Sequence, residues 1–162
     1  MKRQVFYSFH YGNDVRRVAQ IRNIGALEDN KPVSENDWEE VKKSGKKAIE
    51  DWIDKQMNYR SCVVVLVGED TANRPWVKYE IEKAWNEGRG LVGIYIHNIK
   101  DPVYGKCNRG ANPFDGFTMN RDGRKLSSIV KCYNPSPYDA YNDIKNHIEE
   151  WIEEAIQIRN NY

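Results

Sequence analysis

Features that would place this 162-residue chain in a membrane or on a nucleic acid are scarce. No apolar run approaches the roughly 18 residues of a membrane-spanning helix. The first residues, MKRQ, lead into a short strand pattern and not into a signal peptide. The 25 basic and 24 acidic residues leave a net charge of +1, which indicates neither a nucleic-acid surface nor a membrane surface. We therefore expect a cytoplasmic protein without nucleic-acid or membrane partners.

The sequence also has few of the residues and motifs that bind metals, form disulfides or bind cofactors. The three cysteines, Cys62, Cys107 and Cys132, are widely spaced and form no CxxC pair, so neither a disulfide framework nor a zinc site is expected. The three histidines are too scattered to indicate a metal site. The sequence contains no GxxxxGK[ST], GxSxG or HExxH motif, which leaves P-loop, hydrolase-elbow and zincin chemistry without support.

The most informative stretch is residues 61–88, in which an apolar run leads through a polar turn into a helix. The run Cys62–Val67 is β-branched and aliphatic, which is typical of a strand covered on both faces of a parallel sheet. Pro75 suits the first position of a helix, and Gly88 suits the left-handed residue that ends one. The stripe of this helix that would pack on the sheet is Val77, Ile81, Ala84 and Trp85.

Strand and helix patterns alternate along the chain, which favours an α/β fold: an open parallel sheet with helices on both faces. We expect one domain over residues 1–162, with about five strands in the flavodoxin-like order 2-1-3-4-5. A helix after Ser34 would be kinked or broken at Gly45. The strands are expected at residues 4–9, around 24–27, and at 62–67, 89–98 and 125–133. A long irregular loop is expected at residues 99–124, and a closing helix at 138–159.

With this strand order the switch point lies between the first and third strands, and open α/β sheets bind ligands at the carboxyl edge there. Residues 8–14 after the first strand and residues 68–80 after the third would line this crevice. The catalytic candidate is Glu80, and the residues that we assign to substrate binding in these stretches are Ser8, Phe9, His10, Tyr11 and Trp76. Periodicity alone also fits Glu80 as one more surface carboxylate of a charged helix.

A single carboxylate among aromatic side chains points to one kind of chemistry. Receiver domains share this topology but need an acidic pair after the first strand and an aspartate ending the third, where this chain has Ser8-Phe9-His10 and Val67-Gly68. Cleavage of a bond to a sugar suits Glu80 better, because a fixed negative charge can stabilise an oxocarbenium-like transition state. If the leaving group is already a cation, such as a pyridinium, no general acid is needed.

At these residues the chain resembles the TIR superfamily, and more closely its bacterial TIR-like branch, which includes the signalling subunit of the Thoeris anti-phage system. The first TIR box is similar to residues 3–14, RQVFYSFHYGND. The stretch with the catalytic glutamate is similar to residues 73–85, NRPWVKYEIEKAW, whose Trp-x-x-x-Glu pattern places Trp76 and Glu80. VGIYIHN at residues 92–98 and NPFD at 112–115 also look typical of the branch, so the resemblance covers nearly the whole chain.

The resemblance implies an enzyme that cleaves the nicotinamide–ribose bond of NAD⁺ and releases ADP-ribose or a cyclic isomer. NAD⁺ would be the substrate, and no cofactor or metal is expected. By the same resemblance, a diffusible cyclic nucleotide made on phage infection would activate a partner effector protein that consumes NAD⁺. A phage-derived trigger and a homo-oligomer are the further partners that the resemblance implies.

The chain departs from the usual TIR pattern after the second strand. A loop important for self-association and site closure is replaced there by ALEDNKPVSENDWEEV, residues 26–41. Asn30 and Asp37 are candidates to line the crevice, and they fit as helix caps or surface charges at least as well. A basic cradle for the diphosphate of NAD⁺ is a role for Arg74, Lys78 or Lys31.

Two other functions remain open at this point. A non-catalytic TIR-like scaffold would use its helices for protein–protein assembly, and Glu80 would then be dispensable. An enzyme of related fold that cleaves the N-glycosidic bond of a free nucleoside or nucleotide would need Glu80 but not a diphosphate cradle.

Overall fold

A computed structural model describes residues 3–24, 28–29, 41 and 43–162, with the backbone alone at residues 11, 13, 28 and 29. Its described strands form one parallel sheet in the order β2-β1-β3-β4-β5, so the predicted α/β fold with strand order 2-1-3-4-5 is confirmed. The strands are β1 (Gln4–Ser8), β2 (Glu28–Asp29), β3 (Cys62–Val67), β4 (Gly90–Tyr95) and β5 (Cys132–Tyr133). The helices are α1 (Tyr11–Arg22), α3 (Lys46–Met57), α4 (Pro75–Asn86) and α5 (Ala140–Asn160).

The centre of the sheet is formed by β3 and β4, which pair along their whole length. All six residues of each strand are buried. The unbroken β-branched run in the sequence predicted this burial, because a strand covered on both faces has no polar face to show. The predicted bounds of β3 are those found, whereas the strand predicted at residues 89–98 is shorter, Gly90–Tyr95.

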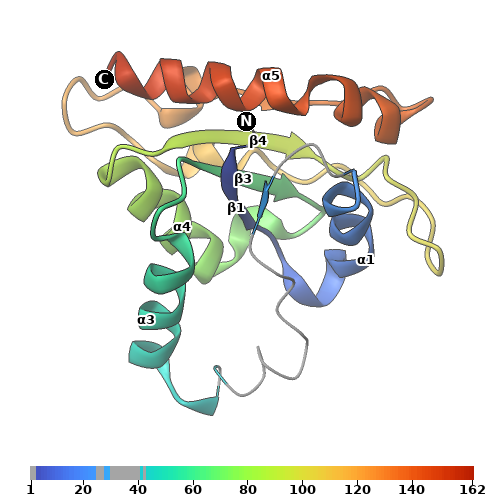
Figure 1. The fold of residues 1–162 in the computed structure, drawn as a ribbon, viewed down its shortest axis with the longest axis horizontal. Coiled ribbons are helices and arrows are strands. Elements are labelled where there is room, and N and C mark those ends of the chain that lie inside the picture. The colour runs from blue at the N-terminus through green and yellow to red at the C-terminus, as the bar shows by residue number, and fades with distance from the viewer. Residues whose placement is uncertain (1–2, 25–27, 30–40, 42) are drawn as a thin grey trace.

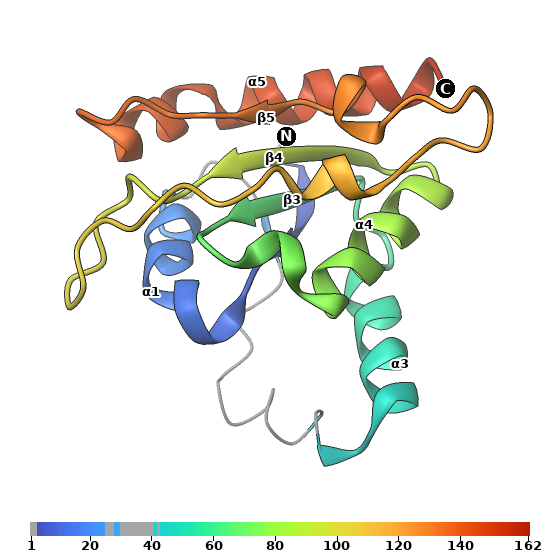
Figure 2. The same cartoon turned by 180° about the vertical axis from the view of Figure 1, so that it is seen from behind.

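Helices cover both faces of the sheet, as Figures 1 and 2 show. On one face α1 and α5 pack against a core that includes Val64, Leu66, Ile94, Ile144, Ile148 and Ile152. On the other face α3 and α4 pack against Val63, Val65 and Val67 through Ile53, Ile81 and Ala84. The two layers arise because successive residues of a strand point to opposite faces.

The predicted helix signals of α4 are all present. Pro75 is its first residue, and Gly88, beyond its end, takes the left-handed φ of 80°. Its buried apolar side chains are Val77, Ile81 and Ala84, and Trp85 is half-buried against the same core. This packing fixes the rotation of α4 about its axis, and with it the direction of Glu80.

The inward stripe of α1 is half polar. Val18 and Ile21 are buried, but the stripe begins with Asp14 and Arg17, which are only 1% and 4% exposed. These four residues follow the spacing of one helix face. The first turns of α1 therefore bring a buried ion pair, and not an apolar contact, toward the carboxyl edge of the sheet.

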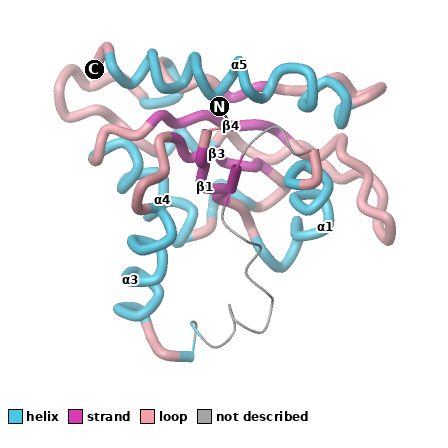
Figure 3. Tube along the Cα trace, in the orientation of Figure 1, coloured by secondary structure: helices cyan, strands magenta, loops and turns pink. Residues whose placement is uncertain are grey.

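Irregular chain connects β4 to β5, and Figure 3 shows it as mostly loop. Two short 3₁₀ turns, η2 (Pro113–Gly116) and η3 (Leu126–Ser128), interrupt this segment. Phe114, Leu126 and Val130 are buried in the core on the α3–α4 face. These side chains cover the part of the sheet that a crossover helix would otherwise cover.

The strand predicted at residues 125–133 is wrong for most of its length. Cys132 and Tyr133 pair with Gly93 and Ile94, but residues 126–128 form η3. Leu126 and Val130 are spaced four apart and both turn into the core, so the apolar positions follow a turn and not the alternation of a strand.

The remaining elements lie close to their predicted places. Residues 25–27, where part of an edge strand was expected, lie outside the described residues, and β2 follows at Glu28–Asp29. Gly45, with φ of 95°, immediately precedes α3. α5 ends at Asn160, and the Asp139 side chain accepts a hydrogen bond from the Asn142 N–H at its start. None of the helices in the described part of the chain has the length and apolar character needed to cross a membrane.

Candidate functional site

The carboxyl ends of β1 and β3 lie side by side at the switch point of the sheet. β1 pairs with β2 on one side and with β3 on the other, and Ser8, the last residue of β1, is opposite Val65. Ligands of open α/β sheets bind at such a position because the connections from neighbouring strands leave to opposite faces there. The structure therefore places the switch point where the sequence predicted it.

Side-chain alternation along β1 divides the predicted residues between the two faces. Phe6 belongs to the core under α3 and α4, and Ser8, two residues later, lies on that same face. Tyr7 and Phe9 pack against the core under α1 and α5. Phe9 is thus on the face opposite to α4, and its assignment to substrate binding remains a prediction.

Glu80 lies in the second turn of α4 and is 8% exposed. The Ser8 hydroxyl lies close enough to the Glu80 carboxyl to lower its pKa. The geometry of a hydrogen bond is nevertheless not met: among the described residues, neither Ser8 Oγ nor Glu80 Oε2 has a hydrogen-bond partner. The buried carboxyl of Glu80 in α4 therefore lies near Ser8 at the end of β1.

Burial dominates the electrostatics of this carboxyl. It raises the pKa of Glu80 from 4.5 to about 8, and the Ser8 hydroxyl opposes the rise. No lysine or arginine of the described ranges acts to lower it. In the unliganded protein the Glu80 carboxyl is therefore mostly neutral at pH 7, and its charged form lacks a positive partner.

The other predicted residues of α4 lie around its start. Trp76 is half-buried, and its ring meets that of Tyr79 edge-on, with centroids 5.7 Å apart and an interplanar angle of 77°. The Tyr79 hydroxyl donates a 2.8 Å hydrogen bond to Asp54, which ties α4 to α3. Arg74 is exposed at the amino end of α4, so its guanidinium is accessible to a ligand.

The remaining predicted positions are only partly described. His10 is the residue before α1, and its carbonyl accepts a 3.0 Å hydrogen bond from the Asp14 N–H. Tyr11 begins α1, and the structure describes its backbone alone. Asn30 and Asp37 lie outside the described residues, so their proposed contact with the crevice remains a prediction.

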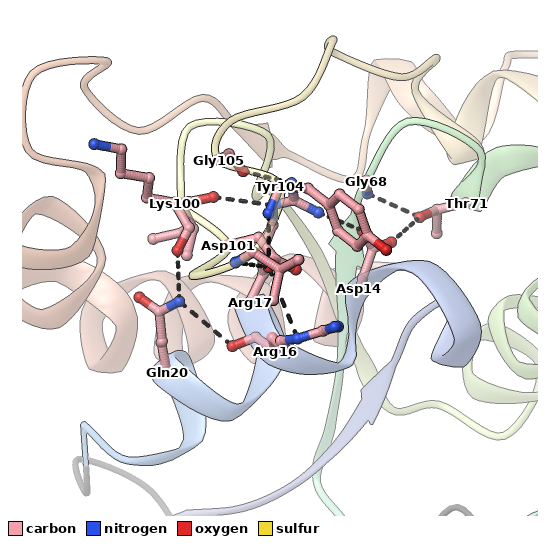
Figure 4. A network of polar contacts seen from close by, with 12 residues as sticks. Asp14, Arg16, Arg17, Gln20, Gly68, Thr71, Lys100, Asp101, Tyr104 and Gly105 are labelled. Carbon is pink, nitrogen blue, oxygen red and sulfur yellow. Dashed lines mark hydrogen bonds and ion pairs between the residues drawn. The ribbon is translucent and has the colours of Figure 1, made fainter.

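A second polar cluster at the same edge was not predicted. Asp14 of α1 contacts both Arg17 of the same helix and Thr71, which lies after β3 in the short 3₁₀ turn η1 (Thr71–Asn73), and all three are buried. Figure 4 shows Asp14 between Arg17 and Thr71. The sequence signal was the placement of two charged residues on the same helix face as Val18 and Ile21, but charges at such positions usually face solvent.

His97, just beyond β4, is a further group at this edge. Its Nδ1 is buried and has no hydrogen-bond partner within the described part of the chain. Burial lowers its pKa, and the nearby charges of Arg109 and Lys106 act in the same direction. Across residues 3–24, 28–29, 41 and 43–162, no group of three or more His, Cys, Asp or Glu side chains is placed to hold a metal ion.

Comparison with known proteins identifies the family. The family model described as "Thoeris protein ThsB, TIR-like domain" matches residues 6–101. The chain belongs to this Thoeris ThsB TIR-like family. A curated relative from Bacillus cereus (strain MSX-D12), named "Putative cyclic ADP-D-ribose synthase ThsB1", is 35% identical over 133 residues, which cover 78% of this chain and 69% of the relative.

The matched region of the Thoeris ThsB TIR-like family contains the whole candidate site. Residues 6–101 extend from β1 through β4 and include Ser8, Asp14, Thr71 and Glu80. The resemblance stated from the sequence is therefore confirmed at the level of the family. The end of β1 at the switch point, the buried glutamate and the second polar cluster all belong to the part of the chain that matches the family model.

Proposed function

We propose that this Thoeris ThsB TIR-like protein processes NAD⁺ and uses Glu80 to cleave the bond between nicotinamide and ribose. The observation that carries the proposal is the buried Glu80 carboxyl, which lacks a positive partner among the described residues. The family match and the name of the Bacillus cereus relative support NAD⁺ as the substrate. In this proposal NAD⁺ is the substrate, and the reaction needs no cofactor.

The positive charge of the substrate would supply the positive partner that Glu80 lacks among the described residues. The nicotinamide ring of NAD⁺ carries a positive charge, which would favour ionisation of Glu80 when the substrate binds. As the bond from ribose C1′ to the ring nitrogen breaks, its electron pair leaves with the nitrogen and nicotinamide becomes neutral. The positive charge then develops on the ribose, where the Glu80 carboxylate stabilises it. No general acid is required, because the leaving group needs no proton.

The product in this proposal is a cyclic ADP-ribose-type signal. A cyclic product forms when a nucleophilic group elsewhere in the same ADP-ribose unit attacks C1′ of the ribose that carried nicotinamide, in place of water, and gives up its proton. The name of the Bacillus cereus relative favours this outcome over simple hydrolysis. The released nucleotide would activate a partner effector, with a phage component as trigger and self-association as a means of regulation.

The proposal is tested by mass spectrometry of small molecules from cells that express the wild type, Glu80→Gln or Glu82→Gln, with and without phage challenge. Glu82 is a matched control because it is an exposed glutamate of the same helix. We expect an ADP-ribose or cyclic ADP-ribose species in the wild type and in Glu82→Gln. Its level should fall about 100-fold or more in Glu80→Gln, since the variant loses transition-state charge stabilisation.

The alternatives give different results in the same experiment. If all three proteins are folded and equal in phage protection with no nucleotide product, Glu80 is dispensable and the scaffold function is favoured. If a free nucleoside is consumed while NAD⁺ is untouched, the protein is a nucleoside-processing enzyme. Either result overturns NAD⁺ cleavage.

A further inference from the structure

Asp14 and Arg17 form an ion pair that is almost completely removed from solvent. Their side chains are 2% and 5% exposed, and Arg17 Nη1 lies 3.4 Å from Asp14 Oδ1. A buried ion pair is weak evidence for stability, because desolvation of the two charges offsets most of their attraction. The contacts that each partner makes beyond the pair are therefore more informative than the pair itself.

Arg17 holds the base of the long segment that follows β4. Its Nε donates to the Ile99 carbonyl at 2.9 Å, and its Nη2 donates to the Gly105 carbonyl at 2.8 Å. Asp101 closes the turn between these two carbonyls by accepting from the Val103 and Tyr104 N–H groups. One guanidinium thus fixes both ends of the turn at residues 99–105 to α1. Figure 4 shows Arg17 beside Asp101 and Gly105 of this turn.

Asp14 holds the loop that leads into α4. The Thr71 hydroxyl donates a long hydrogen bond of 3.5 Å to Asp14 Oδ2 and accepts a 2.8 Å hydrogen bond from the Gly68 N–H. The carboxyl also packs directly on Gly68, where an added Cβ would lie 2.2 Å from Asp14 Oδ2. On its other side Gly68 meets Gly110, whose added Cβ would lie 2.1 Å from the Gly68 carbonyl oxygen.

This loop sets the start of the helix that carries Glu80. The Arg74 N–H donates to the Thr71 carbonyl at 3.1 Å, and the Lys78 N–H donates to the Arg74 carbonyl at 3.1 Å. The chain of contacts therefore runs from Asp14 through Thr71 to the first turn of α4, and Glu80 follows in the next turn. A displacement of Thr71 would move α4 relative to β1.

We infer that Asp14, Arg17 and Thr71 are positioning residues for the Glu80 site: they clamp the loop before α4 and the turn at residues 99–105 to the same helix. The clamp holds Glu80 beside Ser8 at the end of β1. The effect of the clamp on catalysis rests on the proposed function. The position of Glu80 can be measured by its titration, which does not require catalysis.

The charge of the clamp is also sensitive to pH. Burial raises the pKa of Asp14 from 3.8 to about 6, while Arg17 and the Thr71 hydroxyl oppose the rise. Asp70, in the loop before α4, adds to the rise. On the long segment, Cys107 interacts electrostatically with both Asp14 and Arg17. Below about pH 6 Asp14 becomes neutral, and Arg17 loses its ionised partner.

The test compares Thr71→Val with Thr71→Ser, and Asp14→Asn provides a second break of the same clamp. Thr71→Val keeps the shape of the side chain but removes the hydroxyl, whereas Thr71→Ser retains it. The titration of Glu80 is followed by ¹³C NMR of glutamate-labelled protein, with the signal assigned by its loss in Glu80→Gln. Product levels in phage-challenged cells are measured in parallel.

We expect the pH midpoint of the Glu80 titration to fall by about one pH unit or more in Thr71→Val and Asp14→Asn. In these variants a displaced α4 would let water reach the carboxyl, which favours its charged form. The midpoint should stay near the wild-type value in Thr71→Ser. Product should fall about 10- to 100-fold in the first two variants, as small misplacements of catalytic groups do, and little in Thr71→Ser. The control is Ile148→Val in the α5 core, which lowers the melting temperature without moving the midpoint.

The outcomes separate this inference from the proposed function. An unmoved Glu80 midpoint in folded Thr71→Val and Asp14→Asn overturns the clamp, whatever the activity. A moved midpoint in a protein that makes no product under any challenge supports the clamp and counts against NAD⁺ cleavage. If Ile148→Val moves the midpoint as far as Thr71→Val does, the effect is general loss of stability and the clamp is again overturned.

Discussion

The Ser8 hydroxyl at the end of β1 lowers the pKa of the Glu80 carboxyl in α4, although these two residues are 72 positions apart in the sequence. The contact joins the first strand of the sheet to the helix after the third, across the switch point. Burial pushes the same carboxyl toward its neutral form. The ionisation of Glu80 is therefore set by two opposing effects of one site, and both can be tested.

Removal of the Ser8 hydroxyl should raise the pKa of Glu80 further. In Ser8→Ala the carboxyl loses the group that favours its charged form, while its burial is unchanged. NMR titration of labelled glutamate would give the midpoint directly. Ser61→Ala is the control, since Ser61 lies beside Gln4 at the amino end of the same two strands, and this variant should leave the midpoint unchanged. An unchanged or lower midpoint in Ser8→Ala would show that the hydroxyl does not favour the charged form of Glu80.

The stability of the protein should depend on pH through Glu80. Its pKa is raised from 4.5 to about 8 in the folded state. Between these values the unfolded chain has released a proton that the folded chain keeps, so the free energy of unfolding falls as pH rises. Below the lower value both states are protonated, and above the upper value both are ionised, so the dependence ends.

Glu80→Gln should remove this dependence. Relative to the wild type, the variant should gain stability progressively from about pH 4.5 to about pH 8, by on the order of a few kcal/mol in total. Urea unfolding at a series of pH values measures the difference, and all other titrating groups cancel in it. Glu82→Gln, at an exposed position, should give a flat difference. A flat difference for Glu80→Gln as well would mean that Glu80 is not buried in solution.

A methyl side chain at Gly68 or Gly110 should lower the free energy of unfolding. In Gly110→Ala the new Cβ would lie 2.1 Å from the Gly68 carbonyl oxygen, and in Gly68→Ala it would lie 2.2 Å from Asp14 Oδ2. Such overpacking costs about 1–3 kcal/mol, and the larger loss is expected for Gly110→Ala because backbone cannot move aside as a side chain can. Denaturant unfolding would measure both losses.

The control for these variants is Gly116→Ala. An added Cβ at Gly116 meets nothing within 4 Å, so its free energy of unfolding should change by less than about 0.5 kcal/mol. If Gly110→Ala were as stable as Gly116→Ala, the close approach between residues 110 and 68 would not exist in solution.

Local patterns in the sequence were sufficient to predict the frame of the site. The β-branched run Cys62–Val67 predicted the central strand, and Pro75 and Gly88 marked the helix after it, because these signals depend on near neighbours in the chain. Alternation of strands and helices then predicted the parallel sheet and its order, which places Glu80 at the switch point.

The spacing of apolar residues gave wrong or incomplete predictions where a residue packs against a distant part of the chain. Residues 125–131 read as a strand, yet Leu126 and Val130 fill a gap in the core that exists because no helix crosses between β4 and β5. The separation of Phe9 from Glu80 also needed the fold, since alternation says that Ser8 and Phe9 point apart but not which of them faces α4.

By itself, the sequence determined the α/β class, the strand order, the family resemblance and the position of Glu80 along the chain. Only the tertiary structure decided that Asp14 and Arg17 are buried, because the carbonyls of Ile99 and Gly105 and the hydroxyl of Thr71 come from segments more than 50 residues away. Charged residues in an amphipathic helix look like surface residues until their partners are in place. The energetic cost of burying a charge is met by long-range contacts, which a local pattern does not contain.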